Sequence, residues 1–71
     1  MNSKESSKVR RLARVVIRAN KVLDDAASAF NWLESPNAAL RGNMPLSLLD
    51  TDIGTESVLD ALGRIEHGVF A

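Results

Sequence analysis

The chain has 71 residues, with nine basic and nine acidic side chains, one histidine and no cysteine. A chain of this size forms one small domain and buries only about 60% of its unfolded surface. The lack of cysteine excludes a disulfide framework and a thiolate metal site, and no apolar run approaches the roughly 20 residues of a membrane helix. We therefore expect a cytoplasmic protein with no membrane partner and with marginal stability on its own.

Charge is distributed unevenly along the chain. Residues 1–21 carry seven basic side chains and one acidic side chain, a net charge of +6. Residues 22–71 carry two basic and eight acidic side chains, a net charge of −6. This asymmetry predicts either that the two halves pair with each other or that the basic segment faces an acidic partner.

Residues 1–8 are polar and are expected to form a disordered tail, with the folded domain spanning residues 9–71. From Val9 onward, apolar residues recur every three or four positions, which predicts an amphipathic helix of about four turns. The predicted apolar face consists of Val9, Leu12, Ala13, Val16, Ala19, Asn20 and Leu23. The opposite face is basic and carries Arg10, Arg11, Arg14, Arg18 and Lys21.

A second helix is predicted to begin after Asp24 or Asp25, because an aspartate there can accept from free backbone N–H groups and suits the positive end of the helix dipole. Its predicted apolar face consists of Ala26, Ala29, Phe30 and Leu33.

A corner of two short helical turns follows in residues 35–49. Ser35 and Pro36 have the types expected at an N-cap and a first helical position, which predicts a short helix ending at Gly42. Pro45 also has the type expected at a first helical position, which predicts another helical turn that reaches Leu49. The side chains available to fill this corner are Trp32, Leu33, Leu40, Met44, Leu46, Leu48 and Leu49.

The last helix is predicted from about Thr55, as its cap, to about His67, with Gly68 as a left-handed terminating residue. Gly63 inside it costs about 1 kcal/mol relative to alanine, which indicates either close packing or simple tolerance. The apolar stripe consists of Val58, Leu62, Ile65 and Val69. No alternating run predicts a strand. The fold class is therefore all-α, with two longer amphipathic helices, an intermediate helix and short helical turns.

The residue types argue against an enzyme. No glycine-rich phosphate loop is present, the single histidine, His67, suits a helix C-terminus, and the paired aspartates lack the regular oxygen spacing of a calcium loop. We expect no catalytic residue, no metal site and no cofactor. The basic residues Arg10, Arg14, Arg18 and Lys21 could attract nucleic-acid phosphate, but no base-reading helix or interleaved aromatic residues accompany them. They could equally contact solvent, acidic residues of this chain or an acidic partner.

The sequence resembles the toxin-binding domain of Xre/MbcA/ParS antitoxins over residues 9–71. The residues that carry the resemblance are Trp32-Leu33, Pro36-Asn37, Ala39-Leu40, Gly42, Pro45-Leu46, Leu48-Leu49, Thr51, Val58, Leu62, Arg64-Ile65 and Gly68. The resemblance implies an antitoxin of a type II toxin–antitoxin system that inhibits a RES-domain toxin, which consumes NAD or uses it for ADP-ribosylation. It also implies that the last helix and the C-terminal tail occlude the active-site cleft of the toxin. The implied toxin-binding residues are Arg64, Ile65, Gly68, Val69, Phe70 and Ala71.

Two departures from the family pattern qualify this interpretation. Family members usually carry an N-terminal helix-turn-helix region that is missing here, so we do not expect operon repression to be inherited. Arg41 and Ser47 replace the more usual glycine and acidic residue, which bears on the choice of partner. The alternative function is a small DNA-binding or operon-regulating protein that uses the basic helix. A third hypothesis, a homodimer, depends on Val15, Ile17 and Val22 being exposed.

Overall fold

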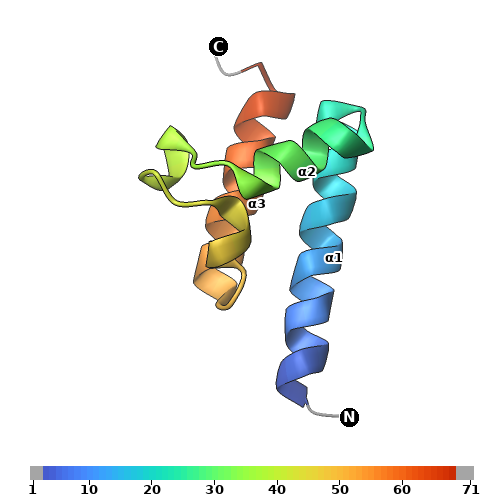
Figure 1. Ribbon diagram of the computed structural model, residues 1–71, viewed down its shortest axis with the longest axis vertical. Coiled ribbons are helices and arrows are strands. Elements are labelled where there is room, and N and C mark those ends of the chain that lie inside the picture. The colour runs from blue at the N-terminus through green and yellow to red at the C-terminus, as the bar shows by residue number, and fades with distance from the viewer. Residues whose placement is uncertain (1–2, 69–71) are drawn as a thin grey trace.

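A computed structural model describes residues 3–68, and within this range the chain forms helices and no extended strand. The elements, in order, are the α-helices α1 (Ser3–Leu23) and α2 (Ala26–Glu34), the 3-10 helices η1 (Ala38–Leu40) and η2 (Pro45–Leu48), and the α-helix α3 (Asp52–Glu66). In Figure 1, α1 and α3 lie side by side, α2 crosses them near one end, and the two 3-10 helices return the chain to the start of α3. The predicted all-α class is confirmed.

Helix α1 begins at Ser3, within the segment that the sequence analysis assigned to a disordered tail of residues 1–8. The helical pattern of apolar residues starts only at Val9. Lysine and glutamate are good helix formers, however, so Lys4, Glu5 and Lys8 can continue the helix toward the N-terminus without burying an apolar face.

The buried face of α1 differs from the predicted stripe. Val15 and Ala19 are fully buried, whereas Val9, Leu12 and Ala13 are exposed. The C-terminal part of the predicted stripe does reach the core, because Ala19 belongs to the stripe and Val16 and Leu23 pack against the core. The N-terminal part does not, and there Val15 is buried and the Arg11 side chain is largely covered. The periodicity count missed this because it gave arginine no place inside, although a long arginine stem can pack against apolar groups while its charged head finds partners elsewhere.

Helix α2 begins as predicted at an aspartate cap. The residue is Asp25, whose Oδ2 accepts from the Ser28 N–H and from the Ser28 hydroxyl, both at 2.9 Å. Asp24 makes the turn from α1 with a left-handed φ of 59°, a conformation that aspartate tolerates better than most residues. Only part of the predicted apolar face is buried, because Ala29 and Leu33 enter the core whereas Phe30 is 51% exposed.

The Asp25 cap predicts a stability change at low pH. The hydrogen bonds from Ser28 hold the pKa of Asp25 below its ordinary value, so between the two values the unfolded chain binds more protons than the folded one. The contribution of Asp25 to the free energy of unfolding is therefore fully present above about pH 3.9, the ordinary aspartate pKa. This contribution is lost as the pH falls through the lower pKa of the folded chain. Thermal melting of the chain and of Asp25→Asn across this range checks the prediction. The asparagine variant keeps a cap acceptor and should lose this component of the pH dependence; an unchanged pH profile would contradict the prediction.

The corner between α2 and α3 is built differently from the prediction at its start. Ser35 terminates α2 instead of capping the next helix, and Asn37 caps η1 by accepting from the Ala39 N–H at 2.8 Å. The turn after η1 passes through left-handed positions at Arg41 and Gly42, with φ of 60° and 82°. Pro45 begins η2 at its first helical position, as predicted.

Helix α3 starts one turn before the predicted cap. Thr51 is the N-cap and accepts from the Gly54 N–H at 2.9 Å. Thr55 is buried inside the helix, where its hydroxyl donates to the Thr51 carbonyl oxygen at 2.8 Å. Both threonines have a residue type that can cap a helix. Thr51 caps α3, because Thr55 is buried within the helix. Asp60 and Arg64, four residues apart on α3, form an ion pair at 3.2 Å.

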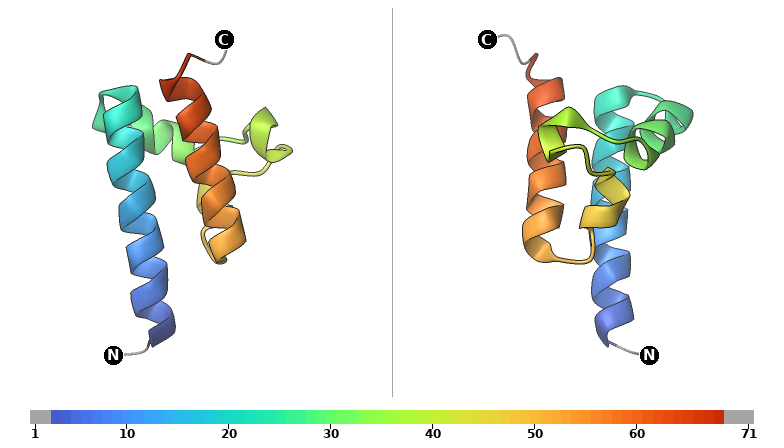
Figure 2. Two further views of the ribbon diagram at one scale, coloured as in Figure 1. Left: turned by 180° about the vertical axis from the view of Figure 1, so that it is seen from behind. Right: turned by 60° about the vertical axis from the view of Figure 1, so that its left-hand side comes forward.

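One core joins the three α-helices and the corner (Figure 2). Its largest fully buried side chains are Leu33, Leu49, Leu62, Val15 and Val58. Leu33 and Leu49, from the corner region predicted to fill the angle between the helices, lie at its centre. Among the described residues, no helix is both long enough and apolar enough to cross a membrane.

Candidate functional site

The C-terminal end of α3 leaves side chains exposed on the surface. Leu62 is the last fully buried residue of the helix, and Ile65, one turn later, is 39% exposed. Gly68 follows with a left-handed φ of 79° and donates its N–H to the Ile65 carbonyl oxygen at 3.2 Å, so it terminates the helix as predicted. We call Arg64, Ile65 and Gly68 the C-terminal edge. The other predicted toxin-binding residues, Val69, Phe70 and Ala71, lie outside the described residues.

Arg64 lies on the side of α3 that faces η1. It borders a small cavity of about 150 Å³ that Leu40, Ser57 and Asp60 also line. The Arg64 guanidinium bonds to Asp60 at 3.2 Å, with both side chains largely exposed. An exposed pair of this kind contributes little to stability, so Arg64 can exchange Asp60 for a carboxylate of a partner at small cost.

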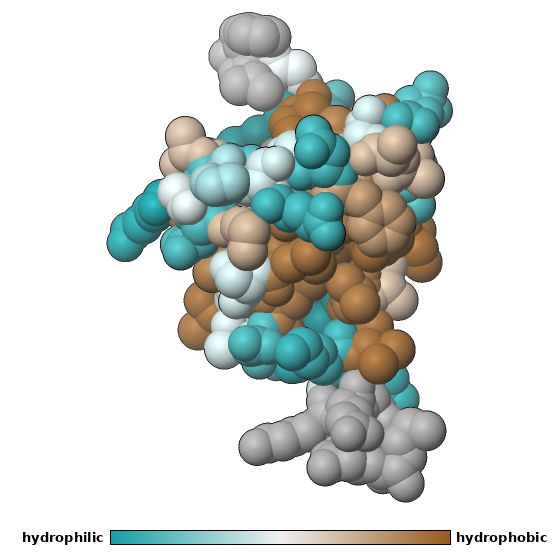
Figure 3. All heavy atoms as spheres, in the orientation of Figure 1, coloured by the Kyte–Doolittle hydropathy of each residue, from teal (hydrophilic) through white to brown (hydrophobic). Residues whose placement is uncertain are grey.

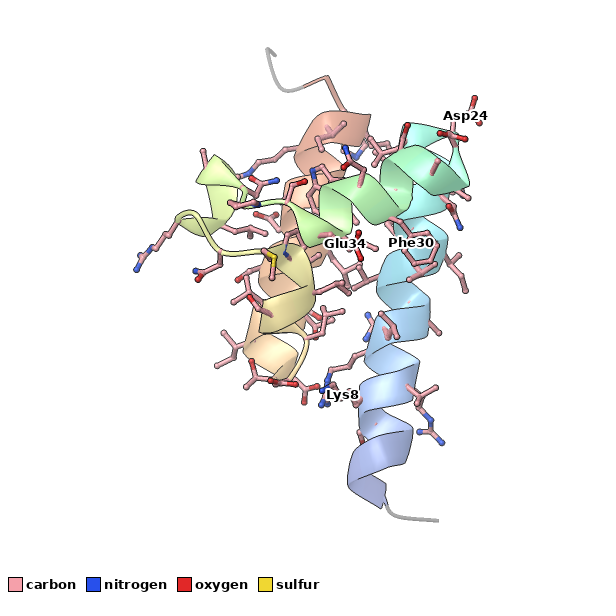
Figure 4. All side chains as sticks on the ribbon, in the orientation of Figure 1. Lys8, Asp24, Phe30 and Glu34 are labelled. Carbon is pink, nitrogen blue, oxygen red and sulfur yellow. The ribbon has the colours of Figure 1, made fainter. Side chains whose placement is uncertain are left out.

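Of the two alternatives that the charge asymmetry left open, the structure shows pairing between the two halves of the chain. Three ion pairs join α1 to the acidic half: Lys8 to Asp50 at 3.0 Å, Arg11 to Asp52 at 3.2 Å and Arg18 to Glu66 at 2.6 Å. In Figure 4, Lys8 projects from α1 toward the acidic residues before α3. Much of the basic charge of α1 is therefore compensated within the chain.

Arg11 has a structural role that the sequence analysis missed. Its side chain is only 17% exposed, and its guanidinium donates to the Leu49 carbonyl oxygen at 2.8 Å and to the Asp50 carbonyl oxygen at 3.2 Å. These are carbonyls between η2 and α3 that no helix satisfies. Through these hydrogen bonds, Arg11 holds the C-terminal end of the corner against α1. The net charge of the segment gave no indication of this role.

The predicted basic residues separate into two groups. Arg14, Arg18 and Lys21 line a groove of about 470 Å³ whose apolar lining is Ile17 of α1 and Leu59 of α3. We call these five residues the basic groove. Figure 2 shows from behind that α1 and α3 lie side by side there, with α2 and the corner on the far side of the molecule. Arg10, the fourth predicted residue, is exposed on α1 but does not line the groove.

The residues assigned to a homodimer face are not exposed together. Val15 is fully buried and Val22 packs against the core, so only Ile17, which is 68% exposed, remains on the surface. On the other side of the molecule, Figure 3 shows apolar side chains gathered below α2, in the angle between α1 and η2. The exposed large apolar residues of the described chain are Val9, Leu12, Ile17, Phe30, Met44, Ile53 and Ile65.

Across residues 3–68, no group of three or more histidine, cysteine, aspartate or glutamate side chains is placed to hold a metal ion. His67 is exposed at the end of α3, where its backbone N–H donates to the Gly63 carbonyl oxygen at 2.9 Å. The described surface thus carries exposed apolar side chains and ion pairs.

Comparison with known protein families identifies the family of this chain. The family model described as the antitoxin Xre/MbcA/ParS C-terminal toxin-binding domain matches residues 18–68. The chain belongs to this family. Residues 18–68 of this Xre/MbcA/ParS domain begin in the second half of α1 and end at Gly68.

Curated relatives of this Xre/MbcA/ParS domain carry antitoxin names. A protein named Antitoxin Xre from Yersinia enterocolitica is 38% identical over 68 residues, which cover 94% of this chain and 46% of the relative. Another Antitoxin Xre, from Photorhabdus laumondii, is 36% identical with the same coverage. A protein named Prs ADP-ribosylating antitoxin from a Sphingobium species is 30% identical over an alignment that covers 100% of this chain and 50% of the relative. The chain spans about half the length of these relatives.

Proposed function

We propose that the chain is the toxin-binding module of a type II antitoxin and that it inhibits a RES-type, NAD-consuming toxin. In this proposal, the end of α3 and the C-terminal tail occlude the active-site cleft of the toxin. The chain itself carries out no catalysis, holds no cofactor and acts in the cytoplasm, where NAD is consumed. The observation that carries the proposal is the C-terminal edge: α3 continues beyond its last fully buried residue, Leu62, and leaves Arg64 and Ile65 on the surface.

The names of the relatives support the proposal. Membership of the family supports a toxin as the partner, and the name of the Sphingobium relative includes ADP-ribosylation, a reaction that takes its ADP-ribose from NAD. The RES class of the toxin comes from the resemblance alone.

The alternative function, binding to DNA through α1, receives less support from the charges. Three basic residues of α1 already pair with carboxylates of the same chain, which reduces the number of phosphates that α1 can neutralise and hence the affinity for DNA.

The proposal is tested by measuring NAD consumption by a purified RES-domain toxin, with and without an equal concentration of the chain. We expect suppression together with a complex that gel filtration detects. A stable complex without suppression would overturn the occlusion mechanism while keeping the partner. If no complex forms and the chain is retained on DNA in a salt-dependent manner, the DNA-binding function replaces the proposal.

A further inference from the structure

We propose that the basic groove binds an acidic segment of the toxin, with an apolar side chain of that segment seated between its carboxylates. The inference rests on the proposed function for the identity of the partner. It adds a second contact area, on α1, to the contact at the C-terminal edge.

The first observation is uncompensated charge. Of the three basic residues in the groove, Arg18 is paired with Glu66, whereas Arg14 and Lys21 form no ion pair with any residue in the described part of the chain. The acidic half of this chain therefore leaves two positive charges on one wall of the groove. A partner with carboxylates at matching positions gains electrostatic complementarity, which favours both the association rate and specificity.

The second observation is the apolar lining. Ile17 is 68% exposed and lies among the basic residues, with Leu59 half-buried beside it. Burial of an exposed isoleucine by an apolar side chain is favourable. A groove lined by both apolar and basic side chains therefore fits an amphipathic protein segment.

The same lining argues against two other occupants. A nucleic-acid backbone would use the basic residues but gain nothing from Ile17 and Leu59, because its attraction comes from phosphate charge. A second copy bound about a two-fold axis through the groove would place the basic residues of one groove against those of the other, and this like-charge contact is unfavourable.

The position of the groove allows one partner to cover both contact areas. The ion pair between Arg18 and Glu66, at 2.6 Å, connects the groove wall to the last turn of α3. Arg64 and Ile65 lie in the same turn. A toxin that receives the C-terminal edge in its cleft can therefore reach the groove with a neighbouring surface.

The test uses two double variants that change the net charge equally. Arg14→Glu/Lys21→Glu reverses the uncompensated charges of the groove, and Lys8→Glu/Arg10→Glu reverses two exposed charges of α1 outside it. We expect the groove variant to raise the Kd for the RES-type toxin about tenfold at low salt, and the control to raise it less than about threefold. Ile17→Ser should raise the Kd by a similar factor at both low and high salt, because its contact is apolar. All the substituted side chains are exposed, so thermal melting should show that the variants remain folded.

Each outcome decides the inference. If the toxin binds the wild type and the groove variant equally well, the groove is not a contact area, although the proposed function stands. If both double variants weaken binding equally, the effect is long-range attraction and the groove inference is overturned. If the wild type does not bind the toxin, the proposed function fails and the inference fails with it. Displacement of the toxin by double-stranded DNA that requires Arg14 and Lys21 would assign the groove to nucleic acid.

Discussion

Removal of residues 69–71 is expected to abolish inhibition of the toxin and to leave the helical fold intact. The core contribution of α3 ends at Leu62, because Glu66, His67 and Gly68 are all exposed. A change outside the core usually alters the free energy of unfolding by less than about 0.5 kcal/mol, so the melting temperature should stay within about 4 °C of the full chain. The deleted residues include Phe70, and an aromatic side chain is a suitable group for anchoring a segment in a pocket.

The measurement is residual NAD consumption by the toxin at equal concentrations of truncated chain. Ile53→Ser is a matched control, because Ile53 is an apolar residue, 83% exposed, at the opposite end of α3. This variant should inhibit as well as the wild type. Full inhibition by the truncated chain would remove the tail from the mechanism, and loss of inhibition by Ile53→Ser would move the contact to the N-terminal end of α3.

Gly54→Ala is expected to cause the largest loss of stability from a single added methyl group. A Cβ at Gly54 would lie 2.0 Å from the backbone carbonyl oxygen of Leu48, so η2 and α3 would have to separate. Overpacking of this kind costs about 1–3 kcal/mol or more. A domain of this size has a total stability of only about 3–10 kcal/mol. Thermal unfolding followed by circular dichroism should show a fall in melting temperature of roughly 5–20 °C.

Gly63→Ala is the matched control in the same helix. A Cβ at Gly63 would meet no atom within 4 Å, so simple tolerance, and not close packing, explains the glycine there. Alanine should therefore stabilise the chain by up to about 1 kcal/mol through its higher helix propensity. Equal effects of the two substitutions would contradict the packing of η2 against the first turn of α3.

Local features of the fold could be predicted because their hydrogen bonds join residues close in the sequence. Asp25 caps α2 through Ser28, three residues away, and Pro45 begins η2. The predictions failed where two residues suited one role or where one residue suited two roles. Thr51 and Thr55 both have the chemistry of an N-cap, and Ser35 can either end α2 or begin the next turn. In both cases the packing of the corner, which no local pattern encodes, determined the result.

For the candidate site, the residue types of the C-terminal edge and of the basic face followed from the sequence and the resemblance. Their arrangement did not. The pattern of α1 placed Arg14, Arg18 and Lys21 on a polar face, and the homodimer hypothesis required Ile17 to be exposed. Only the packing of α3 beside α1 brings Leu59 to these residues and forms the groove. Helix periodicity identifies residues that share a face, whereas a groove needs a second element from a distant part of the chain.

The sequence by itself determined the all-α class and the ends of several helices, because helix periodicity and local caps are properties of short segments. The charge asymmetry left two alternatives, and the structure shows pairing of the two halves through three ion pairs. Only the tertiary structure decided which face of α1 is buried. Ala19 of the predicted stripe is joined in the core by Val15, which lies outside that stripe, and Arg11 donates to the Leu49 carbonyl oxygen, 38 residues away in the sequence. Burying an arginine is favourable only when carbonyl and carboxylate partners are already positioned to receive it. The folded corner supplies those partners, and no pattern within α1 can specify them.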